Sequence, residues 1–403
     1  MTPSEYFTGI HTFWMQHIHS FYVSVRFSFA LAHAFTTTIV TVYLLSKGLS
    51  YANIGAVWGV TLFFSTVLDF PTGNFADLYG RKLAFVVGVT SIGAGDIIFG
   101  LSTEIWMFFV GAFFVGLGSA QVSGSISSWV VDEQTKAKKE DTISKIFGDG
   151  SATASIGGIL GGVIIGTFFA GPLELLYFVA GVLFVLTGVF VFVSIPDNYG
   201  EPKEGWIGLP KEVLSHYVHS LPLIILSVLL ILILGLYTVY LFIWQPLALE
   251  MGILKGDLGY LYALYMGGSA VGAVVMGRVS KRYGEIFTLV VSLGLAAAGF
   301  FMISIHAGFN EFICGLVVLA FGYGGVVPVF YAWMNTFIPS SIRASASSLI
   351  HTIGTGGMMV LQVVMGVFIE AYGLKPAAFI AAAFAGIGIL ALFYLSRRDK
   401  QVG

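Results

Sequence analysis

Apolar runs of about 20 residues recur along the whole chain and are separated by short polar segments. In helical form such a run is long enough to cross the hydrocarbon core of a bilayer, which is roughly 30 Å thick. Lipid offers no partners to backbone N–H and C=O groups, so each run must be a helix that bonds them internally. The runs predict twelve spans, over residues 17–46, 51–75, 83–103, 105–131, 143–169, 172–195, 221–249, 256–278, 284–306, 309–338, 341–370 and 374–396.

The composition excludes a water-soluble helical protein. Of the 403 residues 57% are hydrophobic and only 10% are charged, which is more apolar surface than a soluble fold of this size can bury. No helix face is reserved for water. The net charge of -2 and the scattered Lys and Arg residues give no basic stripe, so we expect no nucleic-acid partner.

The basic residues predict the orientation. Cytoplasmic loops of membrane proteins are enriched in Lys and Arg. With the N-terminus inside, fifteen basic residues fall on inner loops and the tail and three fall on outer loops, Lys47, Lys255 and Lys375. We therefore expect a multi-pass protein of the cell membrane with both termini in the cytoplasm.

An internal repeat divides the chain into halves. A shift of 204 residues superimposes nine glycines, against about three expected by chance. The pairs are Gly48/Gly252, Gly55/Gly259, Gly73/Gly277, Gly80/Gly284, Gly95/Gly299, Gly111/Gly315, Gly118/Gly322, Gly150/Gly354 and Gly162/Gly366. Because six spans separate equivalent points, the repeat is parallel, about an axis along the membrane normal. The fold expected is an all-α membrane protein with two pseudo-twofold-related bundles of six helices.

The domain boundaries follow from this repeat. We expect an N-terminal bundle over 1–195, a cytoplasmic linker over 196–220 that opens with Pro196-Asp197-Asn198, and a C-terminal bundle over 221–403. Residues 210–220 are a candidate interfacial helix. Thr2, Pro3 and Glu5 predict a further helix start, whose apolar residues are expected on the bilayer surface. These residues are Phe7, Ile10, Phe13, Trp14 and Ile18.

One loop carries a family resemblance. After the second span the chain reads Gly73-Asn-Phe-Ala-Asp77-Leu-Tyr-Gly80-Arg81-Lys82. This resembles the cytoplasmic signature loop of the major facilitator superfamily, G-x6-G-R-K with an internal Asp. The resemblance implies a twelve-helix transporter that works by alternating access, without specifying its substrate.

The resemblance also implies that this loop is a conformational latch. Asp77 is expected to face the start of helix 11 near Ser340 and Ser341, where a helix N-terminus favours an anion. Arg81 is expected to reach Asp132 or Glu133 at the inner end of helix 4.

The second half keeps the glycines of the loop, Gly277 and Gly284, but places Lys281 and Glu285 where the first half has Asp77 and Arg81. This exchange suggests a complementary latch in which Glu285 pairs with Arg343 or Lys139. Ordinary solvated loop charges are the alternative for both loops.

Ionisable residues inside the membrane are the best candidates for the solute or proton path, because unpaired charges are costly in lipid. Arg26 and Asp69 lie at equal predicted depth on adjacent helices, which permits an ion pair. Arg26 and His33 also share a polar helix face with Thr37 and Thr41. Asp69 and Asp149 are candidate proton carriers, and a fixed structural pair is the alternative for each.

Further candidates lie on the helices that the family places around the solute path. Helix 4 offers Gln121, Ser125, Ser128 and Asp132 on one face, and helix 11 offers His351, Thr355 and Gln362. The repeat-equivalent Trp129 and Trp333 are candidates to flank the cavity, although packing is the commoner role of a tryptophan.

The functional expectation is a secondary transporter for a small organic solute, with proton-coupled efflux of an amphiphilic compound favoured. The alternative is a carrier for an organic or inorganic anion that uses Arg26 and His33. Proton-coupled drug exporters of the family usually carry an Arg in helix 4 where this chain has Ala112. A membrane-embedded enzyme or a channel is disfavoured, because no catalytic motif is present and a channel does not require matched halves. We expect no cofactor, no metal and a monomer.

Overall fold

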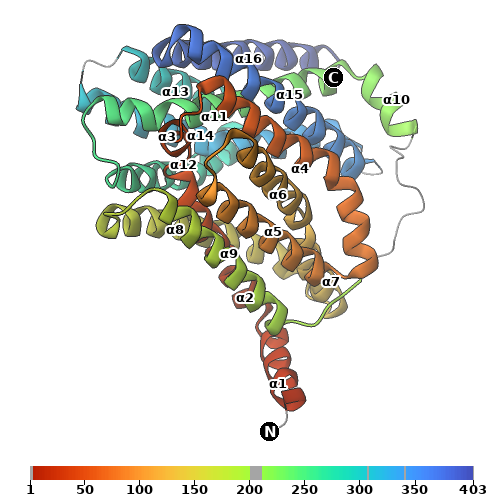
Figure 1. The fold of residues 1–403 in the computed structure, drawn as a ribbon. Helices are drawn as coiled ribbons and strands as arrows, with labels where there is room; N and C mark the ends of the chain where they lie inside the picture. Colours follow the sequence, from red (N-terminus) through yellow and green to blue (C-terminus); the bar gives the residue numbers. More distant parts are fainter. Residues whose placement is uncertain (1–2, 200–210, 306–307, 340–341, 403) are drawn as a thin grey trace. The chain divides into compact units, whose positions relative to one another are not determined.

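The computed structural model describes residues 3–199, 211–305, 308–339 and 342–402, and every regular element in these ranges is a helix (Figure 1). The elements are α1 Pro3–Gln16, α2 Ile18–Thr37, α3 Val40–Ser46, α4 Tyr51–Tyr79, α5 Arg81–Leu101, α6 Ile105–Val122, α7 Ser125–Lys136, η1 Glu140–Thr142, α8 Ile143–Phe168, α9 Glu174–Ser194, α10 Lys211–His219, α11 Leu221–Glu250, α12 Leu258–Tyr283, α13 Glu285–Ile305, α14 Phe309–Met334, η2 Asn335–Phe337, α15 Arg343–Tyr372 and α16 Leu374–Val402.

Within the described residues twelve spans are long and apolar enough to cross a membrane, which confirms the predicted number. Their bounds are Ile18–Ser46, Tyr51–Asp69, Arg81–Leu101, Ile105–Lys136, Glu140–Phe168, Glu174–Ser194, Leu221–Glu250, Leu258–Tyr283, Glu285–Ile305, Phe309–Phe337, Ser345–Tyr372 and Leu374–Arg397. Large apolar side chains remain exposed along them, such as Leu186 at 56% and Val189 at 52% on α9. This is the pattern of helices whose solvent is lipid rather than water.

Two of the predicted spans are broken helices. The first breaks between α2 and α3, where the Thr38 hydroxyl donates to the carbonyl of Ala34. The fourth breaks between α6 and α7 at Gly124, whose φ of 72° is in the left-handed region that favours glycine. The four polar residues expected on one face of helix 4 therefore lie on two separate helices, which corrects that expectation.

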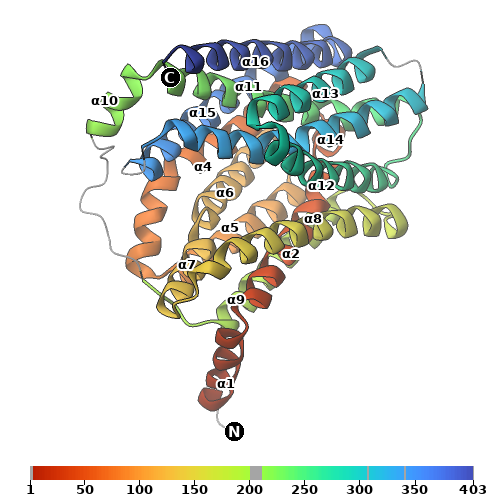
Figure 2. The same ribbon diagram turned by 180° about the vertical axis from the view of Figure 1, so that it is seen from behind.

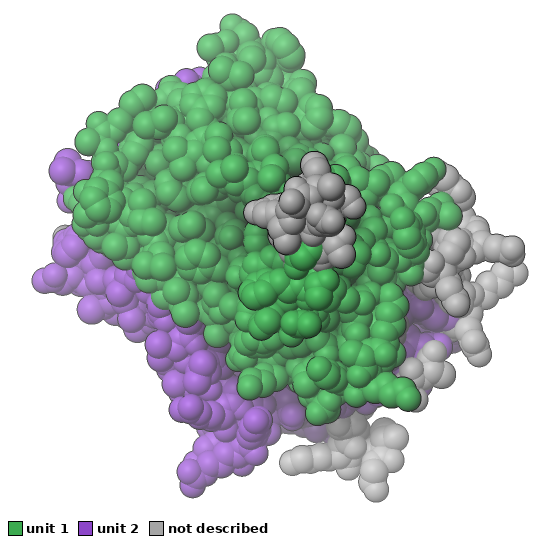
Figure 3. Space-filling view, turned by 90° about the horizontal axis from the view of Figure 1, so that it is seen from below, with its two compact units in different colours: residues 1–43, 60–206, 256–263 green, residues 44–59, 207–255, 264–403 purple. Residues whose placement is uncertain are grey.

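The helices form two compact units, which Figure 3 colours separately. Unit 1 contains residues 1–43, 60–206 and 256–263, and unit 2 contains residues 44–59, 207–255 and 264–403. In unit 1, α2 packs against α8 and α9, and α5 packs against α6 and α9 (Figure 1). In unit 2, α11 packs against α15 and α16, and α13 packs against α14 and α16 (Figure 2).

These two packing schemes are the same scheme shifted by six spans. Small residues make the close approaches possible, as is common between membrane helices. In unit 1 a Cβ on Gly157 of α8 would lie 2.6 Å from the carbonyl oxygen of Phe27 on α2. In unit 2 a Cβ on Gly299 of α13 would lie 2.5 Å from the backbone nitrogen of Leu319 on α14.

Helices α4 and α12 are each divided between the two units: the first residues belong to one unit and the remaining residues belong to the other. The first residues of α4 lie in unit 2, where a Cβ on Gly55 would collide with the carbonyl of Gln362 on α15. The first residues of α12 lie in unit 1, where Gly259 is in equally close contact with the carbonyl of Gly162 on α8. Gly55 and Gly259 are equivalent under the repeat, so the two crossings are counterparts.

A helix begins at Pro3, where the sequence predicts one, whereas Thr2 lies outside the described residues. Trp14 packs edge-on against Phe21 and Phe190 of unit 1, and Ile18 is only 7% exposed. Ile18 is therefore part of the core and not of the surface expected for it, whereas Trp14 is partly buried against the same core. The predicted linker helix is present as α10.

Candidate functional site

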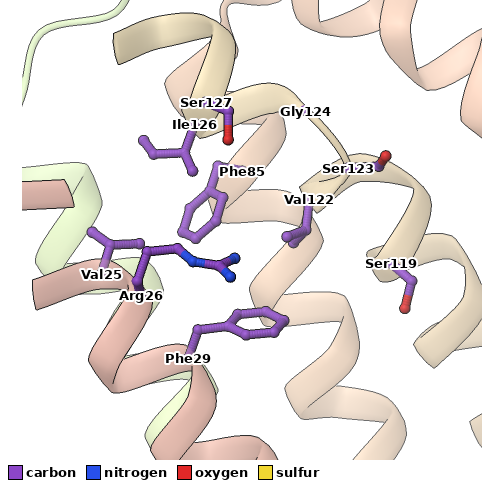
Figure 4. A pocket seen from close by; sticks show the side chains of 10 residues that line it. All are labelled: Val25, Arg26, Phe29, Phe85, Ser119, Val122, Ser123, Gly124, Ile126 and Ser127. Carbon is purple, nitrogen blue, oxygen red and sulfur yellow. The ribbon is translucent and has the colours of Figure 1, made fainter. Parts of the chain in front are cut away.

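Unit 1 contains a cavity of about 240 Å³ at the break between α6 and α7 (Figure 4). Its lining combines apolar side chains with one cation and several hydroxyl groups. The lining residues are Val25, Arg26, Phe29, Phe85, Ser119, Val122, Ser123, Gly124, Ile126 and Ser127. A hollow that joins apolar walls with a few polar groups can hold a small organic ligand that has both an apolar and a polar part.

Arg26 extends from α2 into this cavity, and its guanidinium lies between the rings of Phe29 and Phe85 (Figure 4). Gly150 of α8 leaves room chiefly for the ring of Tyr22, with which a Cβ there would collide, and such a Cβ would also lie 3.3 Å from Cγ of Arg26. Within the described part of the chain the guanidinium forms no ion pair, so the expected pair with Asp69 is absent. The cavity therefore holds a cation that no carboxylate among the described residues of unit 1 neutralises.

The start of α7 adds hydrogen-bond donors next to this cation. The N–H of Ser128 donates to the carbonyl of Gly124 at 2.8 Å, but in this described stretch the N–H groups of Ser125, Ile126 and Ser127 have no protein acceptor. Free N–H groups at a helix start carry partial positive charge. The hydroxyl of Ser127 lies 3.4 Å from that of Tyr22, so it is only weakly engaged. This arrangement can bind a negatively charged or strongly polar group.

The signature loop lies in unit 1 between α4 and α5. Arg81 forms an ion pair with Asp132 of α7, one of the two partners expected, and its Nη2 lies 3.6 Å from Oδ1 of Asp77. Gly80 has a φ of 108°. The Nζ of Lys82 lies 5.0 Å from the centroid of the Phe192 ring on α9. Glu133 instead pairs with Lys136 at 2.6 Å. Ser340 and Ser341, the expected neighbours of Asp77, and the side-chain surroundings of Gly73 lie outside the described residues.

The second-half loop differs from the complementary latch that the sequence suggests. Gly284 has a φ of 87°, matching Gly80, and a Cβ on Gly277 would meet open space. Among the described residues Glu285 and Lys281 form no ion pair, and Arg343 donates to the carbonyl of Ile338 at 3.4 Å. The expected pair of Glu285 with Arg343 is therefore absent, because the guanidinium turns to the backbone preceding its own helix.

The remaining unit 1 candidates do not gather at the cavity. Asp149 pairs with His19 at 2.8 Å, and both side chains are nearly half exposed. His33 bonds to the hydroxyl of Thr37 one turn on. Gln121 is 7% exposed, and its Oε1 has no partner among the described residues. Trp129 is completely buried and donates to the carbonyl of Pro196 at 3.1 Å. It is a packing residue rather than part of the cavity wall, because its ring is enclosed by the core.

The unit 2 candidates are similarly dispersed. Trp333 is 5% exposed and packs edge-on against Phe337. His351 is exposed and stacks on Tyr331, with ring centroids 6.5 Å apart. Gln362 is 4% exposed, and its backbone carbonyl lies in close contact with Gly55.

The sequence reasoning missed the two phenylalanines and the serines around Arg26. The Ser123-Gly124 pair was the available signal, since such dipeptides mark turns, but its place inside a long apolar run concealed it. It also missed the contacts of Asp197 and Asn198, which bond to residues more than sixty positions away.

Among the described residues no group of His, Cys, Asp or Glu is arranged to hold a metal ion.

Comparison with known proteins identifies relatives along nearly the whole chain. The uncharacterized MFS-type transporter YxaM of Bacillus subtilis (strain 168) is 24% identical over 91% of this chain and 94% of its own length. The sialic acid transporter NanX of Escherichia coli (strain K12) is 25% identical over 79% of this chain and 78% of its own. Multidrug resistance protein 1 of Bacillus subtilis (strain 168) is 21% identical over 71% of this chain and 75% of its own.

Solved structures share the fold. The crystal structure of the nucleoside transporter NupG matches with a TM-score of 0.77 at 14% identity, over 93% of this chain and 98% of that one. The family model of the Major Facilitator Superfamily matches residues 22–252 and 225–403. This family match, together with the twelve apolar spans in the described part of the chain, shows a multi-pass membrane transporter and not an enzyme. The chain belongs to the Major Facilitator Superfamily.

Proposed function

We propose that this transporter moves a small amphiphilic organic solute across the cell membrane by alternating access between its two bundles, residues 1–195 and 221–403, joined by the linker 196–220. The observation that carries the proposal is the cavity of about 240 Å³ in unit 1, in which two aromatic rings surround one guanidinium. Aromatic and aliphatic walls suit an apolar body, whereas Arg26 and the serines suit a polar end.

Proton coupling is proposed on the pair formed by His19 and Asp149. Their side chains are 2.8 Å apart and nearly half exposed, so water can reach them. Because the imidazole nitrogen and the carboxylate oxygen lie within hydrogen-bond distance, a proton can pass between them. Asp69 is retained as a second candidate carrier. Efflux is proposed as the direction, supported by the similarity to Multidrug resistance protein 1.

A second candidate function is a carrier for an organic or inorganic anion, with Arg26 as its anchor and His33 as an accessory group. Two observations favour it: the guanidinium lacks a carboxylate partner in the described chain, and three N–H groups at the start of α7 lack acceptors beside it. The similarity to a sialic acid transporter is consistent with this candidate.

The remaining parts of the proposal concern the assembly. We propose that the protein works as a monomer in the cell membrane with both termini in the cytoplasm. The distribution of fifteen basic residues on one set of loops against three on the other supports this orientation. The signature loop with Arg81 and Asp132 is proposed as the cytoplasmic latch of the conformational change.

Binding and flux together test the proposal. A thermal-shift panel of aromatic carboxylates, aromatic cations and neutral aromatics identifies a ligand, and its flux is then measured in liposomes with and without a pH gradient. The variants are Arg26→Gln and Arg26→Lys, with Lys375→Gln as the control for loss of an exposed cation. A loss of at least about tenfold in carboxylate affinity for Arg26→Gln favours the anion carrier. Carboxylate affinity that is retained in Arg26→Gln, together with a pH dependence of flux that is lost in Asp149→Asn, favours proton-coupled efflux. If Arg26→Gln and Lys375→Gln both behave as the unaltered protein, the cavity is not the solute site.

A further inference from the structure

Asp197 and Asn198, near the beginning of the linker, bond to the start of α5. The Asp197 carboxylate accepts hydrogen bonds from the backbone N–H groups of Lys82 at 2.9 Å and Leu83 at 3.3 Å. The N–H of Arg81 donates to the carbonyl of Asn198 at 3.0 Å. The first three N–H groups of α5 therefore all find acceptors in the segment 196–198. An acidic cap at a helix N-terminus satisfies free donors and also matches the positive end of the helix dipole.

The same segment bonds to α7. The side-chain amide of Asn198 donates to the carbonyl of Trp129 at 3.3 Å and to Oε1 of Glu133 at 3.0 Å. The indole N–H of Trp129 donates back to the carbonyl of Pro196 at 3.1 Å. Asn198 is 4% exposed, so these bonds are formed largely out of contact with solvent. Loss of a partner in such a place leaves a buried polar group unsatisfied.

These contacts surround the ion pair of the latch. Arg81 is the first residue of α5, and Asp132 lies on α7 between the two residues that Asn198 contacts. Asn198 accepts a hydrogen bond from the backbone N–H of Arg81. The same residue donates to α7, the helix that carries Asp132. Gly80 fits this arrangement, because a Cβ there would collide with the carboxylate of Asp197.

We propose that Asp197 and Asn198 are positioning residues of the latch, which fix α5 and α7 so that Arg81 meets Asp132. The inference rests on the proposed alternating-access function, since it assigns to the beginning of the linker a part in the conformational balance. The linker thus does more than connect the two bundles, because its first residues position the helices that carry the latch.

The test measures the conformational balance without substrate. Spin labels are placed on the exposed positions Lys138 and Arg282, one in each unit, in a Cys314→Ser background, and the distance distribution is recorded. The variants are Asp197→Ala, Asp197→Asn, Arg81→Gln and the double variant Asp197→Ala with Arg81→Gln. Asp141→Ala is the matched control, since it removes an exposed carboxylate elsewhere in unit 1.

We expect Asp197→Ala to shift the ratio of the distance populations by at least about threefold, in the same direction as Arg81→Gln. The double variant is expected to shift it no further, because both changes remove one coupled unit. Asp197→Asn, which retains an acceptor, is expected to restore most of the original ratio, and Asp141→Ala to leave it unchanged.

A merely structural cap gives another result. Asp197→Ala would then lower the thermal midpoint and leave the distance populations as they are, or its shift would add to that of Arg81→Gln; either outcome overturns the proposal. If Asp197→Ala fails to fold, Asn198→Ala is measured under the same criteria. Failure of the proposed function appears separately, as absence of saturable flux in the unaltered protein.

Discussion

The carboxylate of Glu370 accepts a hydrogen bond from the backbone N–H of Ala52 at 3.0 Å, so the end of α15 caps the start of α4 within unit 2. Close packing of the two helices accompanies this bond. A Cβ on Gly55 would collide with the carbonyl of Gln362, and one on Gly366 would collide with the carbonyl of Tyr51. The crossing therefore combines one side-chain cap with two glycine contacts to backbone carbonyls.

Removal of the cap is expected to loosen the start of α4. Glu370→Ala leaves the N–H of Ala52 without its acceptor, so amide hydrogen exchange at Ala52 is expected to become faster. Glu370→Gln keeps an acceptor and is expected to exchange nearly as slowly as the unaltered protein. Equal exchange in all three proteins would show that the cap does not hold α4.

A methyl group at Gly55 is expected to separate the helices of this crossing. Gly55→Ala should destabilise the protein by about 1–3 kcal/mol, because the new Cβ meets a backbone carbonyl that cannot move aside easily. Gly386→Ala is the control, since a Cβ there meets nothing within 4 Å. Thermal unfolding in detergent measures both variants. A destabilisation of Gly55→Ala no larger than that of the control would contradict the close contact.

The repeat offers a matched pair of glycines at the signature loops. Gly80 and Gly284 both have positive φ, at 108° and 87°, but a Cβ on Gly80 would collide with Asp197 whereas one on Gly284 would meet open space. Gly284→Ala is expected to cost about 1 kcal/mol for its backbone conformation alone. Gly80→Ala is expected to cost clearly more in the same unfolding experiment. Equal costs would mean that the cap at Gly80 is not tightly packed.

The pair of His19 and Asp149 is expected to determine the pH dependence of transport. His19→Gln and Asp149→Asn each remove one partner of the hydrogen bond proposed to pass the proton, so the dependence of flux on pH should flatten in both variants. His219→Gln changes an exposed histidine of α10 and serves as the control. A pH profile that keeps its shape in His19→Gln and Asp149→Asn would assign proton coupling to another group.

Much of the fold could be predicted from local patterns. Apolar length alone identified twelve spans, and the glycine coincidences between halves correspond to the shared packing scheme, in which the repeat-equivalent Gly95 and Gly299 closely approach α6 and α14, respectively. Such features depend on residues near one another in sequence or on exact spacing. The ion pair of Arg81 with Asp132 could be predicted because the family resemblance of the signature loop implies a contact between distant residues. Composition alone does not indicate such a contact.

The details of the candidate site could not be predicted in the same way. Helical periodicity assumes an unbroken helix, but the left-handed residue Gly124 breaks the fourth span and creates the cavity beside Arg26. Equal depth suggested that Arg26 meets Asp69, yet side-chain direction decides such a pair, and the guanidinium turns into the cavity instead. The cap by Asp197 joins residues 115 positions apart in the sequence, a relation that local pattern does not encode.

Counterflow in liposomes tests the central claim most directly. Vesicles containing the protein are loaded with the unlabelled ligand found in the thermal-shift panel, and uptake of the labelled ligand is followed over a range of outside concentrations. A carrier that alternates between two states is expected to give saturable uptake that the internal ligand accelerates. The reason is that the internal ligand occupies the binding site during the return to the outward-facing state. Uptake that rises linearly with the outside ligand concentration and does not change with the internal ligand would contradict alternating access.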